Sequence, residues 1–332
     1  MRVHENILEL IGRTPLVRLK TGIPPGGPRA FVKLEFFNPT GSLKDRMVYH
    51  IIKKAMAEGH LKSGDTVIDN TSGNTGVALA MVASQFGLKA VLTTPEKTSK
   101  EKIDLIKSYG AEVIITPITA RYDDPEGFFM VARKLAKERG YYDLDQYHSQ
   151  DNVEAHYLST GPEIWEDTDG KVTHFVAGIG TGGSFSGAAR YLKEQNPHVK
   201  AIAVDPEGSV FSEYIRNKKE TAGSEYQVEG IGSDVITEAL HMELVDEVIT
   251  VSDKDSFNRA RLIAKEEGIS GGGSSGTVAF AMEKVAAGLG PESLMVGIFG
   301  DAGIRYLSKC YNDNWMREHG YLPSPGEVAT RS

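Results

Sequence analysis

The sequence predicts an α/β protein with two three-layer α/β/α domains, each built on a mostly parallel sheet. Short apolar runs alternate with longer segments of helical periodicity between residues 30 and 299, and brief polar joints separate them. This alternation is typical of parallel sheets that helices cover on both faces. A polar stretch at Asp145–Val153 interrupts the alternation near the middle of the 332-residue chain, which is long enough for two medium domains.

The first half begins with a short helical pattern at Asn6–Ile11 and an extended segment at Thr14–Leu19. A strand follows at Ala30–Phe36, and a helix with one apolar face begins at Ser42. In the rest of this half, expected strands alternate with expected helices. We expect strands at Thr66–Asp69, Lys89–Thr93 and Glu112–Thr116, and helices at Thr75–Phe86, Lys100–Ser108 and Pro125–Arg139.

The second half repeats this rhythm and ends in a polar tail. We expect strands at Thr173–Ala177, Lys200–Val204, Glu247–Val251 and Leu294–Phe299, and helices at Ser184–Gln195, Lys254–Glu267 and Ser274–Ala287. The charged run Asn217–Glu225 is typical of an exposed loop, and the tail Pro323–Ser332 is expected to be disordered.

Composition disfavours several classes of function. The net charge of −8 disfavours a nucleic-acid partner, and the single cysteine, Cys310, fits a reducing compartment. The N-terminus lacks the apolar core of a signal peptide, and no segment approaches the ~20 apolar residues of a membrane span. The nine histidines show no paired metal-ligand spacing. We therefore expect a cytoplasmic protein without a nucleic-acid partner, a membrane segment or a bound metal.

The segment Asn38–Arg46 contains the first candidate for chemistry. Lys44 lies in the first turn of the expected helix, where the helix dipole disfavours a positive charge. An amine whose charged form is destabilised suits a nucleophile that forms a Schiff base with a carbonyl compound. The alternative is a surface helix with Lys44 merely exposed, and this segment alone does not decide between the two.

Two further segments follow strands and open helices, where unpaired N–H groups can hold an anion. Thr71–Gly76 consists of six small or polar residues, more than an N-cap by Ser72 or Thr75 requires, and it suits a carboxylate. Gly178–Gly187 suits a phosphate. A fourth segment, Gly271–Gly276, lets backbone approach a ligand closely, and its Ser274 offers a neutral hydroxyl.

The glycine-rich loop also has a competing interpretation. Gly178, Gly180 and Gly183 match the G-x-G-x-x-G pattern of dinucleotide-binding folds, and Asp205 ends the next strand, where a ribose-binding carboxylate would lie. An NAD-dependent oxidoreductase is therefore an alternative. Against it, the loop lies in mid-chain, and the segments around Lys44 and Asn74 would have no role.

Taken together, the four segments resemble, in order and spacing over Glu5–Leu322, the fold-type II pyridoxal-phosphate enzymes of the cysteine synthase and cystathionine β-synthase group. The resemblance implies a tryptophan synthase β-like fold, pyridoxal 5'-phosphate as cofactor, small amino-acid and thiol substrates, and a homodimer. It also implies a smaller mobile domain at 45–145 that binds the substrate carboxylate. A larger domain, 1–44 plus 146–322, would bind the cofactor phosphate.

The same resemblance assigns roles to individual residues. Lys44 would carry the cofactor covalently, Asn74 would bind its ring hydroxyl, and Ser274 would face its pyridine nitrogen. The expected phosphate ligands are Gly180, Thr181, Gly182, Gly183 and Ser184. The expected ligands of the substrate carboxylate are Thr71, Ser72, Thr75 and Gln146.

Several stretches lean toward the cystathionine β-synthase branch, among them Asp205–Ser209, Val228–Gly232 and Asn314–Met316. The haem-bearing arm and the regulatory domain pair of that branch are not found in the sequence, so haem and adenosylmethionine control are not expected. Two places depart from the family pattern. Asp69-Asn70 stands where Glu-Pro is usual, and Phe299–Gly303 differs from the usual Pro-Asp pattern.

The expected reaction is β-replacement on L-serine or an activated serine by a thiol, foremost the synthesis of cystathionine from serine and homocysteine. The freed Lys44 amine would remove the Cα proton, and a neutral Ser274 would favour loss of the β-substituent over transamination. A cysteine synthase that uses O-acetylserine or O-phosphoserine with sulfide is the nearest alternative. A catalytically silent binding partner is disfavoured because Lys44, Asn74 and Ser274 are all present.

Overall fold

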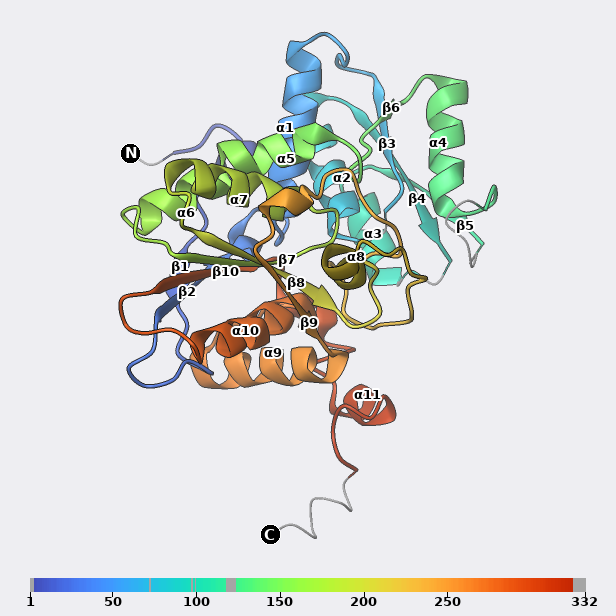
Figure 1. Ribbon diagram of the computed structural model, residues 1–332. Coiled ribbons are helices and arrows are strands. Elements are labelled where there is room, and N and C mark those ends of the chain that lie inside the picture. The colour runs from blue at the N-terminus through green and yellow to red at the C-terminus, as the bar shows by residue number, and fades with distance from the viewer. Residues whose placement is uncertain (1–2, 72, 97, 99, 118–123, 325–332) are drawn as a thin grey trace.

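The computed structural model describes residues 3–71, 73–96, 98, 100–117 and 124–324, and it confirms the predicted α/β class with mostly parallel sheets. Two sheets come from separate parts of the chain (Figure 1). The smaller sheet is entirely parallel. Its strands, in spatial order, are β5 (Glu112–Thr116), β4 (Lys89–Pro95), β3 (Thr66–Asp69) and β6 (Tyr142–Asp143).

Helices cover both faces of the smaller sheet because its side chains alternate between them. Val67 and Leu92 pack into one apolar cluster with helices α1 (Lys44–Ala57), α2 (Asn74–Phe86) and α3 (Lys100–Ser108). Their neighbours Ile68 and Val91 point the other way, toward α4 (Phe128–Arg139). This arrangement is the predicted three-layer sandwich.

The larger sheet has six strands, of which only the edge strand β1 runs antiparallel. In spatial order they are β1 (Leu16–Arg18), β2 (Arg29–Leu34), β10 (Leu294–Phe299), β7 (His174–Gly178), β8 (Lys200–Pro206) and β9 (Glu247–Val251). One face carries α5 (Gln150–Leu158), α6 (Thr160–Asp167) and α7 (Gly183–Gln195), and the other carries α9 (Asp253–Glu267) and α10 (Gly273–Ala286) (Figure 1).

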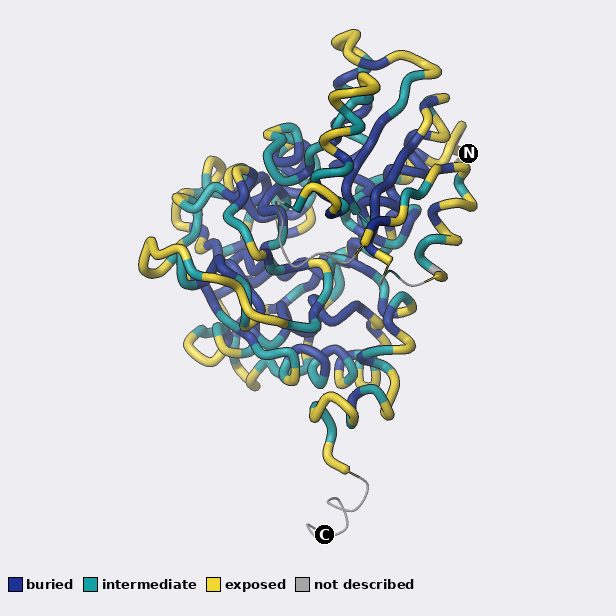
Figure 2. Tube along the Cα trace, turned by 90° about the vertical axis from the view of Figure 1, so that its right-hand side faces the viewer, coloured by how far each residue is buried: buried dark blue, intermediate teal, exposed yellow. Residues whose placement is uncertain are grey.

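The shorter elements lie in connections between these layers. They are the 3-10 helices Ile7–Leu10, Glu35–Phe37, Met242–Leu244 and Gly303–Tyr306, and the helices α8 (Phe211–Asn217) and α11 (Asp313–Glu318). The strands run through the buried interior, while exposed residues gather on outer helices and loops (Figure 2). Within the described ranges, none of the helices combines the length and apolar character needed to cross a bilayer.

Three expectations about elements are wrong in detail. The helix predicted at Pro125–Arg139 begins only at Phe128, because a turn closed by the Gly127 N–H and the Asp124 carbonyl (2.9 Å) precedes it. The stretch Asp145–Val153 is not a simple break, since α5 starts within it, capped by the Ser149 hydroxyl. The helix expected from Ser42 begins at Lys44. The charged run Asn217–Glu225 is confirmed as a largely exposed segment.

All strands of the smaller sheet fall within residues 45–145, and all strands of the larger sheet fall within 1–44 plus 146–322. The division of the chain into two domains at these positions, and the mobility of the smaller one, stay predictions. The expected disordered tail Pro323–Ser332 lies mostly outside the described residues. Because the carboxyl ends of parallel strands gather at one edge of a sheet, the loops after β3, β7 and β10 are placed to build a shared site.

Candidate active site

A cavity of about 330 Å³ lies where these loops meet. It is lined by residues from the start of α1, the turn after β3, helix α3, the loop after β7, the segment after α8 and the segment after β10. Its walls are formed by Lys44, Thr71, Gly73, Asn74, Thr75, Lys102, Gln146, Tyr147, Gly180, Thr181, Tyr226, Val228, Glu229, Gly230, Ile231, Gly232, Arg305 and Tyr306. A narrower cavity of about 30 Å³ shares Lys44, Asn74 and Thr181 with it and reaches Ser184 and Ser274.

Lys44 is the first residue of α1, as expected for a lysine in the first helical turn. The preceding residue is anchored to the larger sheet, because the Leu43 N–H donates to the Gly300 carbonyl (2.9 Å). Among the described residues, Lys44 Nζ has no hydrogen-bond or ion-pair partner. Burial lowers the pKa of the Lys44 amine below its usual value, and the negative charge of Asp301 opposes this shift. The amine is therefore biased toward its neutral, nucleophilic form.

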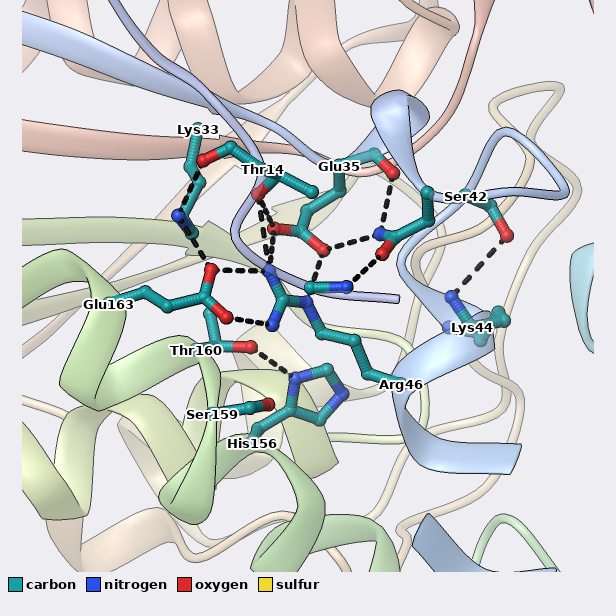
Figure 3. A network of polar contacts seen from close by, with 12 residues as sticks. Thr14, Lys33, Glu35, Ser42, Lys44, Arg46, His156, Ser159, Thr160 and Glu163 are labelled. Carbon is teal, nitrogen blue, oxygen red and sulfur yellow. Dashed lines mark hydrogen bonds and ion pairs between the residues drawn. The ribbon is translucent and has the colours of Figure 1, made fainter. Parts of the chain in front are cut away.

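A buried network of ion pairs and hydrogen bonds around Arg46 anchors the first turn of α1 (Figure 3). Arg46 donates to Glu35 (Nε to Oε2, 2.6 Å) and to Glu163 (Nη1 to Oε1, 2.6 Å). Lys33, on β2, pairs with Glu163 (2.9 Å) and donates to the Thr14 carbonyl (2.9 Å). Buried charges are tolerated only when paired and hydrogen-bonded. The network thus ties α1, β2 and α6 together within two residues of Lys44.

This network predicts an acid-sensitive step in stability. Pairing with Arg46 lowers the pKa of Glu163 from 4.5 to about 2, against the opposing effect of burial. A lowered carboxyl pKa contributes stability that is present above pH 4.5 and is lost as the pH falls toward 2. Because one pKa unit corresponds to about 1.4 kcal/mol, Glu163→Gln should lower the free energy of unfolding by roughly 3 kcal/mol at pH 6. The difference should vanish near pH 2.

Urea unfolding between pH 2 and pH 6 measures this difference. Glu194→Gln is the matched control, because Glu194 pairs with Arg190 on the surface, where both side chains are about half exposed. An exposed pair contributes only about 0–1 kcal/mol. Curves for Glu163→Gln and the unmodified protein that run parallel over the whole pH range would contradict the assignment.

Asn74, the first residue of α2, faces the same cavities as Lys44. Its Nδ2 donates to Asp301 Oδ2 (2.7 Å), and the Tyr306 hydroxyl donates to the same oxygen (2.6 Å). Asp301 is buried, its Oδ1 has no partner among the described residues, and burial raises the pKa of its carboxyl. Asp301 thereby holds the Asn74 amide in one orientation.

Three of the four residues expected to bind a substrate carboxylate are found together at the start of α2. The Thr75 hydroxyl donates to Gln146 Oε1 (2.8 Å), and Thr71 Oγ1 accepts from the Gly73 N–H (3.2 Å). Thr71, Thr75 and Gln146 all line the larger cavity. Ser72, predicted with them, lies outside the described residues. The first N–H groups of α2 add further donors to this wall.

The glycine-rich loop Gly180–Ser184 joins β7 to the first turn of α7. Gly182 has a positive φ of 93°, which side-chain-bearing residues rarely adopt, and a Cβ there would approach the Leu240 backbone to 2.5 Å. A Cβ on Gly183 would lie 2.2 Å from the Asn152 amide, whose Nδ2 donates to Thr181 Oγ1 (3.0 Å). The loop is thus held close to its neighbours with the N-terminal amides of α7 available for an anion.

The donor set fits a phosphorylated cofactor with an aldehyde group. The loop at the N-terminus of α7 offers backbone N–H groups for the phosphate, and Lys44 offers the amine for the aldehyde. Ser274, at the start of α10, lies on the wall of the narrow cavity beside Asp301, whose Oδ1 is the unpartnered buried oxygen. Among the described residues, no group of three or more His, Cys, Asp or Glu side chains is arranged to hold a metal ion.

Sequence reasoning missed part of the cavity wall. Tyr147, Lys102, Tyr226 and Arg305 were not singled out, and Asn152 behind the loop was not either. Asp205, proposed for a ribose in the dinucleotide alternative, is fully buried, and its Oδ2 accepts the Ser212 N–H (2.8 Å) at the start of α8. This hydrogen bond to the start of α8 indicates that Asp205 has a local structural role.

The larger cavity thus brings the Lys44 amine together with part of the glycine-rich loop and with the Thr71 turn, an arrangement that suits an enzyme that handles amino acids with an aldehyde cofactor. A family model described as "Pyridoxal-phosphate dependent enzyme" matches residues 7–301. The chain belongs to this family, and its cofactor is pyridoxal 5'-phosphate. This result confirms the resemblance and replaces the dinucleotide alternative.

Curated relatives of two kinds are similar to the chain. Cystathionine beta-synthase of Apis mellifera is 42% identical over 97% of this chain and 64% of its own length. Cysteine synthase of Staphylococcus aureus (strain N315) is 38% identical over 92% of this chain and 96% of its own length. The crystal structure of O-ureido-L-serine synthase superposes with a TM-score of 0.86 at 30% identity, covering 99% of this chain and 100% of that one. The chain spans about three fifths of the length of its cystathionine beta-synthase relatives.

Proposed function

We propose that the protein catalyses β-replacement on L-serine or an activated serine by a thiol, foremost the formation of cystathionine from serine and homocysteine. The observation that carries this proposal is that Lys44 lines two adjoining cavities, of which one is bounded by Thr71, Thr75 and Gln146 and the other by the glycine-rich loop. The identity of 42% to a relative named cystathionine beta-synthase supports the choice of substrates.

In the proposed reaction, bound pyridoxal phosphate withdraws electrons from the Cα of an amino acid. The chain's own residues do the rest. The backbone amides of Gly180–Ser184 would hold the cofactor phosphate, and Asn74 and Ser274 would orient its ring. Thr71, Ser72, Thr75 and Gln146 hold the substrate carboxylate. The Lys44 amine, whose pKa burial lowers, takes the Cα proton and returns a proton later in the cycle.

We further propose that residues 45–145 close over the larger part when a carboxylate binds at Thr71 and Gln146. Closure would exclude water from the cavity. Lys102 and Glu229 are placed to stabilise the closed form, because their side chains, from α3 and from the segment after α8, both line the cavity and form an ion pair at 2.6 Å. We also propose that the protein is cytoplasmic and forms a homodimer, in which the apolar Ile7 and Leu10, both exposed in the single chain, would be covered.

The second candidate function is a cysteine synthase that uses O-acetylserine or O-phosphoserine with sulfide. It is favoured by the Staphylococcus aureus relative, which the chain covers over 96% of that protein's length. The same residues serve both reactions up to the loss of the β-substituent. The two reactions differ in the leaving group and in the thiol that attacks.

Product identification by mass spectrometry separates the two candidates. The holoenzyme is incubated with L-serine and homocysteine, and in parallel with O-acetylserine or O-phosphoserine and sulfide. We expect cystathionine to form with a kcat/KM at least about tenfold above that for cysteine formation, a difference of about 1.4 kcal/mol in transition-state stabilisation. The reverse ratio would establish the cysteine synthase alternative, and the absence of product from every pair would contradict both.

A further inference from the structure

Asp69 is a buried carboxyl that the mechanism described so far does not use. It ends β3, directly before the turn that carries Thr71, and it has no exposed surface. Its Oδ1 has no hydrogen-bond partner among the described residues. The acidic groups of Asp143 and Asp145 face it, and burial with their charges raises the pKa of the Asp69 carboxyl well above its usual value. A buried carboxyl with one unpaired oxygen destabilises the folded protein, so its presence requires an explanation.

Among the described residues, the side chain that hydrogen-bonds to Asp69 is Gln146, and the Asn70 backbone N–H is a further donor to the carboxyl. Gln146 Nε2 donates to Asp69 Oδ2 (3.0 Å), while Gln146 Oε1 accepts the Thr75 hydroxyl (2.8 Å). An amide with its ends exchanged would place its oxygen against Asp69 Oδ2, the oxygen that accepts a hydrogen bond in the structure. Asp69 therefore selects one of the two amide orientations, and in that orientation Nε2 keeps one hydrogen unspent.

The backbone of Gln146 is fixed independently. Asn152 Nδ2 donates to the Gln146 carbonyl (2.8 Å) and also to Thr181 Oγ1 in the glycine-rich loop (3.0 Å). With its main chain held by Asn152 and its amide held by Asp69, Gln146 has a single place on the cavity wall. A donor held in place before the ligand arrives binds it more tightly than one that must first be ordered.

We propose that Asp69 is a positioning residue, which orients the Gln146 carboxamide so that its free N–H receives the carboxylate of the amino-acid substrate. The proposal rests on the proposed function, because it concerns the carboxylate-binding wall of that site. Asp69 acts only through Gln146 and touches neither cofactor nor substrate. A purely structural Asp69 would instead influence stability without changing the affinity for the amino acid.

The test titrates L-serine into the holoenzyme and follows the visible absorbance of the bound cofactor. Asp69→Leu, which keeps the size of the side chain and removes the hydrogen bond, should raise the dissociation constant about tenfold. Asp69→Asn, which keeps an acceptor oxygen, should stay within about threefold of the unmodified protein. Neither variant should unfold at a lower temperature, since the costly unpaired carboxyl is gone. Asp69→Ala serves the same comparison if the leucine variant does not fold.

A double-variant cycle with Gln146→Ala then shows whether Asp69 acts through Gln146. In the Gln146→Ala protein, Asp69→Leu should add no further loss of affinity. Asp205→Leu is the matched control, because Asp205 is also a buried carboxyl with an unpartnered Oδ1 at the end of a strand, and it lies outside the cavity wall. It should leave the dissociation constant unchanged.

An unchanged dissociation constant in Asp69→Leu, or a loss that simply adds to that of Gln146→Ala, would overturn the inference and leave the proposed reaction intact. A holoenzyme that binds L-serine with the expected pattern among variants, yet forms no product with any thiol, would support the inference and contradict the proposed reaction. No response of the unmodified holoenzyme to L-serine would overturn both.

Discussion

Replacing Lys44 with alanine should abolish turnover and remove the visible absorbance of the purified protein. In the proposed reaction this amine is both the nucleophile toward the cofactor aldehyde and the base that takes the Cα proton, and it lines both cavities. Loss of a general base alone typically slows a reaction about 10²–10⁴-fold, and Lys44 would also carry the covalent link to the cofactor. We therefore expect at least about a 10³-fold loss in kcat/KM, measured by product formation and by the absorbance spectrum.

Lys54→Ala is the matched control for this prediction. Lys54 lies on the same helix, α1, and it pairs with Asp151 (2.6 Å) and Glu154 (2.5 Å) away from the cavity. Its variant should keep the colour and most of the activity. A colourless Lys54→Ala protein, or a Lys44→Ala protein that is yellow and active, would remove Lys44 from the centre of the mechanism.

The second large effect is expected in the glycine-rich loop. Gly182→Ala introduces a Cβ at a φ of 93°, only 2.5 Å from the Leu240 backbone. The left-handed conformation costs an ordinary residue about 1–2 kcal/mol, and the clash displaces the loop whose amides would hold the phosphate. We expect the affinity for pyridoxal phosphate to fall at least about 30-fold, or about 2 kcal/mol, in titrations of the apoprotein.

Gly268→Ala separates backbone strain from crowding in the loop. Gly268 also has a positive φ, 72°, but nothing lies within 4 Å of the Cβ that alanine would add. This variant should lose about 1 kcal/mol of stability and keep its cofactor affinity. Equal losses of cofactor affinity in the two variants would show that the packing of Gly182 against Leu240 does not shape the phosphate site.

Strongly periodic or apolar segments made much of the fold predictable. The strands at Thr66–Asp69, Lys200–Val204 and Leu294–Phe299 lie within a residue or two of where the sequence placed them, because each is a short apolar run between turn residues. Helices α5 and α6 were missed. Their buried faces consist largely of small or polar residues, among them Asn152, His156 and Thr160. The sequence therefore lacks the apolar periodicity from which an amphipathic helix is predicted.

The candidate site was predictable where it consists of consecutive residues in one loop. The Thr71 turn, the glycine-rich loop and Lys44 were all visible as local patterns, and the structure brings them to one cavity. Residues that support the site by contacting its side chains were not visible as local sequence patterns. Asn152 and Asp301 reach the site only through tertiary contacts, 29 and 227 residues from their partners Thr181 and Asn74. Spacing along the chain does not encode contacts of this kind.

We propose that one ε-amine near the start of α1, that of Lys44, holds the cofactor. Borohydride reduction of the holoenzyme makes the covalent link permanent, and proteolysis with mass spectrometry then locates it. We expect a single modified peptide that contains Lys44, and we expect the modification to be lost in Lys44→Ala. A label on another lysine of the cavity, such as Lys102, or no stable label at all, would contradict it.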